Sequence, residues 1–70
     1  FLVQSQDDPL VDSSLAFYLA LKAAGVPAEL HLYPRGGHGY GLLRTGNPTD
    51  AWAALAIDWF GREVMQSRAW

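Results

Sequence analysis

The stretch that decides the fold is Ala28-Glu29-Leu30-His31-Leu32-Tyr33, followed after Pro34 by Gly36-Gly37-His38-Gly39-Tyr40-Gly41. The first part alternates, which predicts a strand over 28–33 with odd- and even-numbered residues on opposite faces. Its half-polar face favours a place at or near the edge of a sheet. Glycine suits a backbone that needs positive φ or a close approach. His38 is therefore predicted on an open loop at the carboxyl end of a strand, where an imidazole suits proton transfer.

Upstream of this strand, the sequence predicts another strand and a helix. Residues 1–4 are apolar and rich in strand-forming types, and they run into the polar cluster Ser5-Gln6-Asp7-Asp8-Pro9. Asp12, Ser13 and Ser14 offer N-cap oxygens for a helix that continues to about Ala24. Gly25 ends this helix, and Val26-Pro27 prevents its continuation.

Downstream of the glycine loop, residues 42–48 read as an irregular connection to a last helix over about 50–65. Thr49 and Asp50 are predicted to cap this helix. Its apolar residues follow the i, i+3, i+4, i+7 spacing of one buried face: Trp52, Leu55, Ala56, Trp59, Phe60 and Val64. Such a stripe indicates core packing rather than a ligand site.

The expected order is strand, helix, strand, loop, helix, which indicates the α/β class. Two strands joined by one helix are predicted to be parallel, neighbouring or nearly so, with a right-handed crossover. Parallel sheets need both faces covered. We therefore expect the 70 residues to be part of a doubly wound, mostly parallel sheet whose other strands lie upstream, and not to fold alone.

The composition excludes several classes of protein. Five Lys and Arg against seven Asp and Glu give a net charge of −2 with no basic patch, which argues against nucleic acid and anionic membrane surfaces as partners. No apolar run reaches the roughly 18 residues of a membrane span. The sequence has no cysteine, hence no disulfide or thiolate metal site. Cytoplasmic, periplasmic and secreted locations all fit, and nothing indicates the oligomeric state.

Chemistry-bearing residues follow both predicted strands. Asp7 and Asp8 come just after the first strand, and His38 comes just after the second. Neighbouring strands lie about 4.8 Å apart, and functional groups gather at the carboxyl ends of parallel strands. A carboxylate that orients a histidine supplies two members of a nucleophile–base–acid triad. The order, acid before histidine, is that of α/β-hydrolases.

The sequence also resembles a known family. Residues 1–11, with Asp8-Pro9-Leu10-Val11, resemble the acid-bearing turn of α/β-hydrolase esterases, which commonly reads Asp-Pro-Leu or Asp-x-x-Val. Residues 25–34 and 36–41 resemble the histidine-bearing end of the same family. The resemblance is closest to acetyl-xylan-esterase-like and dienelactone-hydrolase-like enzymes.

This resemblance implies that residues 1–70 are the C-terminal part of a single α/β-hydrolase domain, in a serine hydrolase acting on carboxylic esters. It makes His38 the general base and Asp8 the orienting acid, with Asp7 as the alternative acid. The one of the two aspartates that does not face His38 is expected to stabilise the turn. The implied substrate is a small ester or an acylated carbohydrate, and no cofactor is implied.

The nucleophile is absent, because no Gly-x-Ser-x-Gly occurs in the sequence. Four serines lack the flanking glycines of a hydrolase nucleophile: Ser5, Ser13, Ser14 and Ser67. The segment alone is therefore expected to be inactive. Two other readings stay open: the end of a prolyl-oligopeptidase-type peptidase domain, and a non-catalytic binding protein of the same fold.

His31, the other histidine, is predicted to be structural because it lies within a strand. A metal site formed by His31, His38 and an aspartate is disfavoured, since His31 points sideways from the sheet and His38 lies beyond its end. The glycine run also lacks the Gly-Lys-Ser/Thr of a phosphate-binding loop.

Overall fold

A computed structural model describes residues 1–65 of the chain. Two parallel strands, β1 (Leu2–Ser5) and β2 (Leu30–Tyr33), pair with Leu2 opposite Leu30 and Ser5 opposite Tyr33. The helix α1 (Val11–Ala23) connects them. After β2 and its loop come a 3₁₀ turn η1 (Pro48–Ala51), the helix α2 (Trp52–Phe60) and a π-helical turn η2 (Gly61–Met65). The element order is therefore strand, helix, strand, loop, helix.

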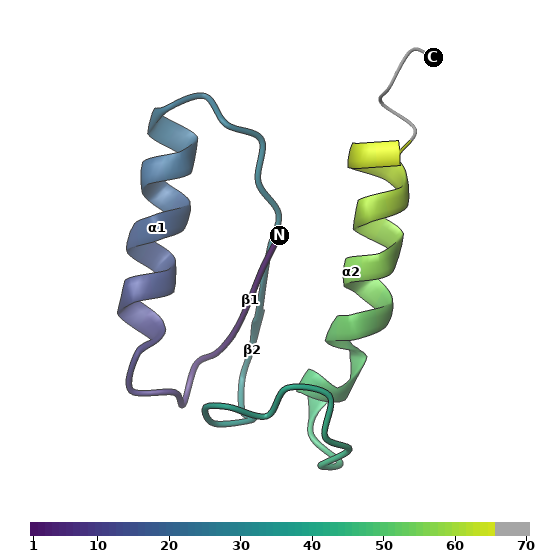
Figure 1. The fold of residues 1–70 in the computed structure, drawn as a ribbon. Helices are drawn as coiled ribbons and strands as arrows, with labels where there is room; N and C mark the ends of the chain where they lie inside the picture. The colour runs from purple at the N-terminus through teal and green to yellow at the C-terminus, as the bar shows by residue number, and fades with distance from the viewer. Residues whose placement is uncertain (66–70) are drawn as a thin grey trace.

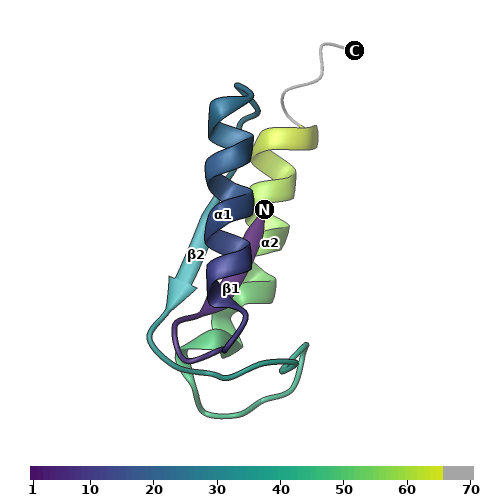
Figure 2. The ribbon, with the colours of Figure 1, turned by 90° about the vertical axis from the view of Figure 1, so that its left-hand side faces the viewer.

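The two helices lie on opposite faces of the sheet, α1 on one side and α2 on the other (Figure 1). Viewed from the α1 side, the strands run behind that helix (Figure 2). Gln4 faces α1, since its Nε2 donates a 2.9 Å hydrogen bond to Ser14 Oγ. Phe1 faces α2, with its ring centroid 5.8 Å from that of Trp59. Phe1, directly before β1, and Gln4 within it are three positions apart and face opposite layers, as the two-residue period of an extended chain requires.

The loops after β1 and β2 and the start of η1 gather at one end of the molecule, at the bottom of Figure 1. This follows from parallel pairing, because the carboxyl ends of parallel strands meet at one edge. The buried residues among 1–65 also lie mostly at this end: Gln4, Ser5, Asp8 and Thr49. All four are polar, and no hydrophobic side chain of the described residues is fully buried.

The start of α1 differs from the sequence-based expectation. The N-cap is Leu10, without a side-chain cap, and Asp12, Ser13 and Ser14 lie within the helix rather than before it. The reason is a turn upstream: the N–H of Leu10 donates to Asp8 Oδ1 (2.8 Å), and the N–H of Val11 donates to the Asp8 carbonyl (3.0 Å). The carboxylate that accepts a hydrogen bond at the start of the helix is therefore that of Asp8, two residues before the N-cap Leu10.

The cap expected from Thr49 and Asp50 is also wrong. Residue Thr49 is buried within η1, and the N-cap, Asn47, makes no side-chain capping bond. The Asp50 carboxylate points back to the preceding loop, where it accepts hydrogen bonds from the N–H groups of Thr45 (3.0 Å) and Gly46 (2.9 Å). The loop therefore competes successfully for the oxygens that a cap would use.

Smaller differences concern the lengths of the elements. The predicted strand over 28–33 begins at Leu30, and the first strand extends one residue further, to Ser5. The predicted helix over 50–65 is a composite of 3₁₀, α and π geometry over 48–65. Within its expected apolar stripe, Phe60 is 49% exposed, while the other five members are half-buried. No helix of the described residues is long and apolar enough to cross a bilayer.

Candidate functional site

Asp8 and His38 form a hydrogen-bonded pair at the carboxyl ends of the strands. The His38 ring meets Asp8 through Nδ1, which lies 2.8 Å from Asp8 Oδ2. An ionised carboxylate only accepts hydrogen bonds, so Nδ1 carries the proton and donates. In the neutral ring the other nitrogen, Nε2, then carries a lone pair. The pair thus presents a base at Nε2.

The two partners differ in exposure. The Asp8 side chain is 3% exposed, whereas that of His38 is 64% exposed. The second Asp8 oxygen, Oδ1, accepts the N–H of Leu10 at 2.8 Å. Both carboxylate oxygens are therefore fixed by donors before any ligand arrives, so the acid cannot rotate away from the imidazole.

Hydrogen bonding also keeps Asp8 ionised. The backbone N–H of Leu10, and then the His38 side chain, lower the pKa of Asp8 below its ordinary value, and burial only partly opposes them. An anionic Asp8 at neutral pH can stabilise the imidazolium that forms when His38 takes up a proton.

Asp7 faces a different part of the same loop. Its Oδ1 accepts the N–H of Gly37 at 2.8 Å, and its Oδ2 lies 3.4 Å from the N–H of Gly36. The carboxylate therefore holds the main chain one and two residues before His38, across a sequence separation of about thirty residues. Gly37 has a φ of 70°, in the left-handed region where glycine is favoured.

His38 opens onto a pocket of about 260 Å³. The aromatic residues of its lining are Tyr40 and Trp52, and Val3 and Gln4 of β1 contribute as well. Trp52 is oriented by a 2.6 Å hydrogen bond from its Nε1 to the carbonyl oxygen of Gly41. The exposed imidazole is thus bordered by a fixed indole, on the side of α2.

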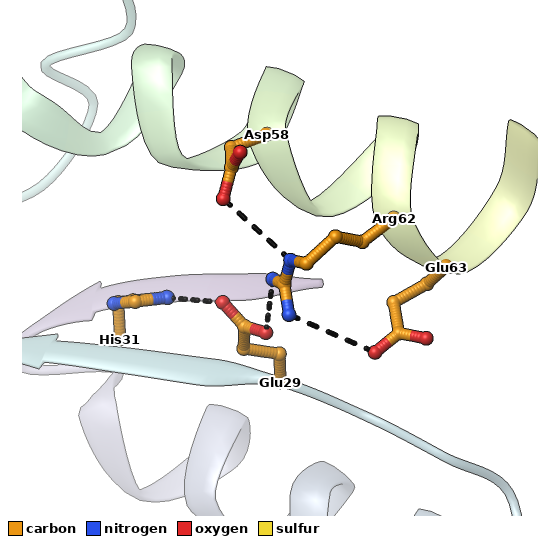
Figure 3. Close-up of polar contacts among 5 residues, drawn as sticks. All are labelled: Glu29, His31, Asp58, Arg62 and Glu63. Atoms are coloured by element: carbon orange, nitrogen blue, oxygen red, sulfur yellow. Dashed lines mark hydrogen bonds and ion pairs between the residues drawn. The ribbon is translucent and has the colours of Figure 1, made fainter. Parts of the chain in front are cut away.

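The second histidine lies in a separate polar cluster between β2 and the last helical segment. Figure 3 shows His31 and Glu29 on the strand side facing Arg62 on the helical side. His31 Nε2 lies 2.6 Å from Glu29 Oε2, and Arg62 Nη2 donates to Glu29 Oε1 at 2.9 Å. The His31 ring also stacks on Phe1, with centroids 5.1 Å apart. His31 and then Arg62 lower the pKa of Glu29.

The structure therefore brings Asp8 and His38 together and keeps His31 apart from them. No group of three or more His, Asp or Glu side chains within residues 1–65 is placed to hold a metal ion. Of the serines considered in the sequence, Ser5 is fully buried and Ser14 bonds Gln4. Ser13 is exposed on α1, and Ser67 lies outside the described residues.

Two features of the site have little or no signal in the sequence. Ser5 and Thr49 are fully buried, although serine and threonine are mostly surface residues. The salt bridge of Arg62 with Glu29 links residues 33 positions apart. The only sequence hint of the buried Ser5 and Thr49 is Gly36, shortly after β2, because glycine often marks a close approach of another group to the main chain.

Comparison with known proteins adds no relative. The chain shows no significant match to a protein-family model, a curated protein or a solved structure.

Proposed function

We propose that these residues supply the acid and the general base of a serine hydrolase acting on carboxylic esters. The single observation that carries this proposal is the Asp8–His38 pair: a buried, doubly hydrogen-bonded carboxylate against Nδ1 of an exposed imidazole. That is the arrangement in which Nε2 can accept a proton from a hydroxyl nucleophile. The resemblance of residues 1–11 and 25–41 to esterases supports the same chemistry.

In each half of the proposed reaction His38 acts first as a base and then as an acid. His38 Nε2 takes the proton of a serine hydroxyl as its oxygen attacks the ester carbonyl, and Asp8 stabilises the imidazolium. The imidazolium then gives the proton to the leaving alcohol as the carbon–oxygen bond breaks. In the second half, His38 takes a proton from water as the water oxygen attacks the acyl carbon. The bond from the acyl carbon to the serine oxygen then breaks, the imidazolium returns its proton to that oxygen, and the carboxylic acid leaves.

The nucleophile in this proposal comes from outside the 70 residues. Ser5 is fully buried, Ser13 and Ser14 belong to α1, and no Gly-x-Ser-x-Gly is present. The lack of a fully buried hydrophobic side chain among residues 1–65 also supports a larger sheet, since parallel sheets are normally covered on both faces. Small esters and acylated carbohydrates are the proposed substrates.

Active-site labelling of the full-length polypeptide tests this proposal. A fluorophosphonate probe should label one serine in the wild type, and peptide mapping should place that serine in a Gly-x-Ser-x-Gly outside residues 1–70. The His38→Ala variant should lose the labelling and the hydrolysis of nitrophenyl acetate, while His31→Ala keeps both. Equal labelling of wild type and His38→Ala would refute the proposal, and cleavage of peptide substrates alone would favour a peptidase.

A further inference from the structure

The loop that carries His38 leaves no space for a side chain at Gly36. A Cβ added at Gly36 would lie 2.4 Å from Thr49 Cγ2, 2.8 Å from Thr49 Oγ1 and 2.9 Å from Ser5 Oγ. Real Cβ atoms essentially never come this near to other heavy atoms. The main chain of the loop therefore rests directly on these two side chains, with no space for a larger residue.

Thr49 is itself held in place. It is fully buried and lies in η1, directly before α2. The next residue, Asp50, ties the start of η1 to the preceding loop through the N–H groups of Thr45 and Gly46. Trp52, one turn later, bonds the carbonyl of Gly41. Thr49 and Trp52 thus lie against the two ends of the glycine loop, at Gly36 and Gly41 respectively.

The burial of Thr49 is not explained by hydrogen bonding. Its Oγ1 and the Oγ of Ser5 are both buried without a partner among residues 1–65. A buried hydroxyl without a partner destabilises a fold, so the contribution of Thr49 lies in its shape. Its γ-methyl group is the atom nearest to the position that a Gly36 side chain would occupy.

We infer that Thr49 is a positioning residue, whose β-branched shape supports Gly36 and so sets the distance between the His38 imidazole and the Asp8 carboxylate. This inference rests on the proposed function. Asp7 holds the same stretch of main chain through its hydrogen bonds, and Thr49 limits how far that stretch can sink toward the sheet. A shift of about 1 Å in a reacting group can cost about a hundredfold in rate.

A series at position 49 in the full-length polypeptide tests the inference. Thr49→Val keeps the β-branched shape and removes a buried hydroxyl that has no partner among residues 1–65, so kcat should stay within about threefold of wild type. Thr49→Ala removes the support, so kcat should fall about ten- to a hundredfold with little change in KM. The downfield proton resonance of His38 Nδ1–H should persist in Thr49→Val and weaken or move in Thr49→Ala. Ser13→Ala, which removes an exposed hydroxyl on α1, is the control and should leave both readouts unchanged.

Each outcome decides the matter. A Thr49→Ala variant with wild-type kcat and an unchanged Nδ1–H resonance would overturn the inference, whatever its melting temperature. A Thr49→Val variant as impaired as Thr49→Ala would also overturn it, because the hydroxyl would then be the active feature. If Thr49→Ala does not fold, Thr49→Ser is judged by the same readouts. Active His38→Ala would instead defeat the proposed function, whereas inactive His38→Ala with fully active Thr49→Ala would defeat only this inference.

Discussion

The molecule pairs an imidazole with a carboxylate twice, and the two pairs are built differently. His38 meets Asp8 through Nδ1, and its ring is 64% exposed. His31 meets Glu29 through Nε2, and its ring is 28% exposed and stacked on Phe1. The Asp8–His38 pair therefore leaves the basic Nε2 of His38 beside a pocket. In the Glu29–His31 pair, Nε2 is used for the contact with the carboxylate and the ring packs on Phe1.

The acids of the two pairs explain much of this difference. Asp8 is 3% exposed and held by a main-chain N–H, so it serves one imidazole only. Glu29 is 30% exposed and is shared between His31 and Arg62, which in turn approaches Asp58 at 3.5 Å. A carboxylate shared with an arginine ties a helix to a strand, whereas a dedicated carboxylate orients a base.

The largest effect should separate the two histidines. In the full-length polypeptide, His38→Ala should lower kcat for ester hydrolysis by about 10⁴- to 10⁶-fold, because triad members act as a unit. His31→Ala should leave kcat within about threefold and lower the melting temperature, since it removes the contacts with Glu29 and Phe1. Steady-state kinetics and thermal unfolding measure both. Comparable losses of kcat in the two variants would contradict the assignment of His38 as the base and of His31 as a structural residue.

The next effect should separate the two aspartates. Asp8→Asn should cost about 10⁴-fold in kcat, because an amide can leave the imidazole in the wrong tautomer, as in a serine protease with the equivalent change. Asp7→Asn keeps an oxygen for the N–H of Gly37 and should cost at most about tenfold. Nitrophenyl acetate hydrolysis by the two variants compares them. A greater loss in Asp7→Asn would make Asp7 the acid.

A smaller effect is expected in the polar cluster at Glu29. Glu29→Gln breaks the charged contacts with His31 and Arg62, so the melting temperature should fall while kcat stays within about twofold. Asp58→Asn is the matched control, because its contact with Arg62 is longer and more exposed. Its melting temperature should fall less. A lower kcat of Glu29→Gln with an unchanged melting temperature would instead indicate that the Glu29–His31 pair takes part in catalysis.

The smallest expected effect is that of acid on Asp8. Its pKa is lower in the folded state than the ordinary value of about 3.9. Its contribution to stability is therefore complete above about pH 4 and is lost as pH falls through the lower, folded pKa. A carboxyl ¹³C titration of the full-length polypeptide should show Asp8 titrating below a typical aspartate. An ordinary or raised pKa would mean that the bonds from Leu10 and His38 do not persist in solution.

How much of this could be predicted from the sequence depends on the range of the interactions. The order of elements followed from alternation and helical spacing. Parallel pairing, which brings both strand ends to one edge, predicted that Asp7 or Asp8 would meet His38. Both predictions therefore needed only the local sequence pattern and the rule that parallel strands end at the same edge of a sheet. The resemblance of Asp8-Pro9-Leu10 to the esterase turn favoured Asp8.

What could not be predicted depends on contacts between distant residues. Asp12, Ser13 and Ser14 were reasonable caps, but the turn at Asp8 starts α1 earlier. Thr49 was predicted as a cap, but it is fully buried and lies beside Gly36, far from it in sequence. Asp7 was expected to stabilise a turn, and its partners are the N–H groups of a loop about thirty residues away.

The most direct test of the difference between the two imidazoles is their tautomeric state, measured by ¹⁵N histidine spectra of the full-length polypeptide in mildly alkaline buffer. The contacts predict opposite tautomers: Nδ1–H with a bare Nε2 for His38, and Nε2–H with a bare Nδ1 for His31. In Asp8→Asn the His38 signals should move toward a mixture, while those of His31 stay unchanged. A wild-type His38 that carries its proton on Nε2 would contradict its role as the base.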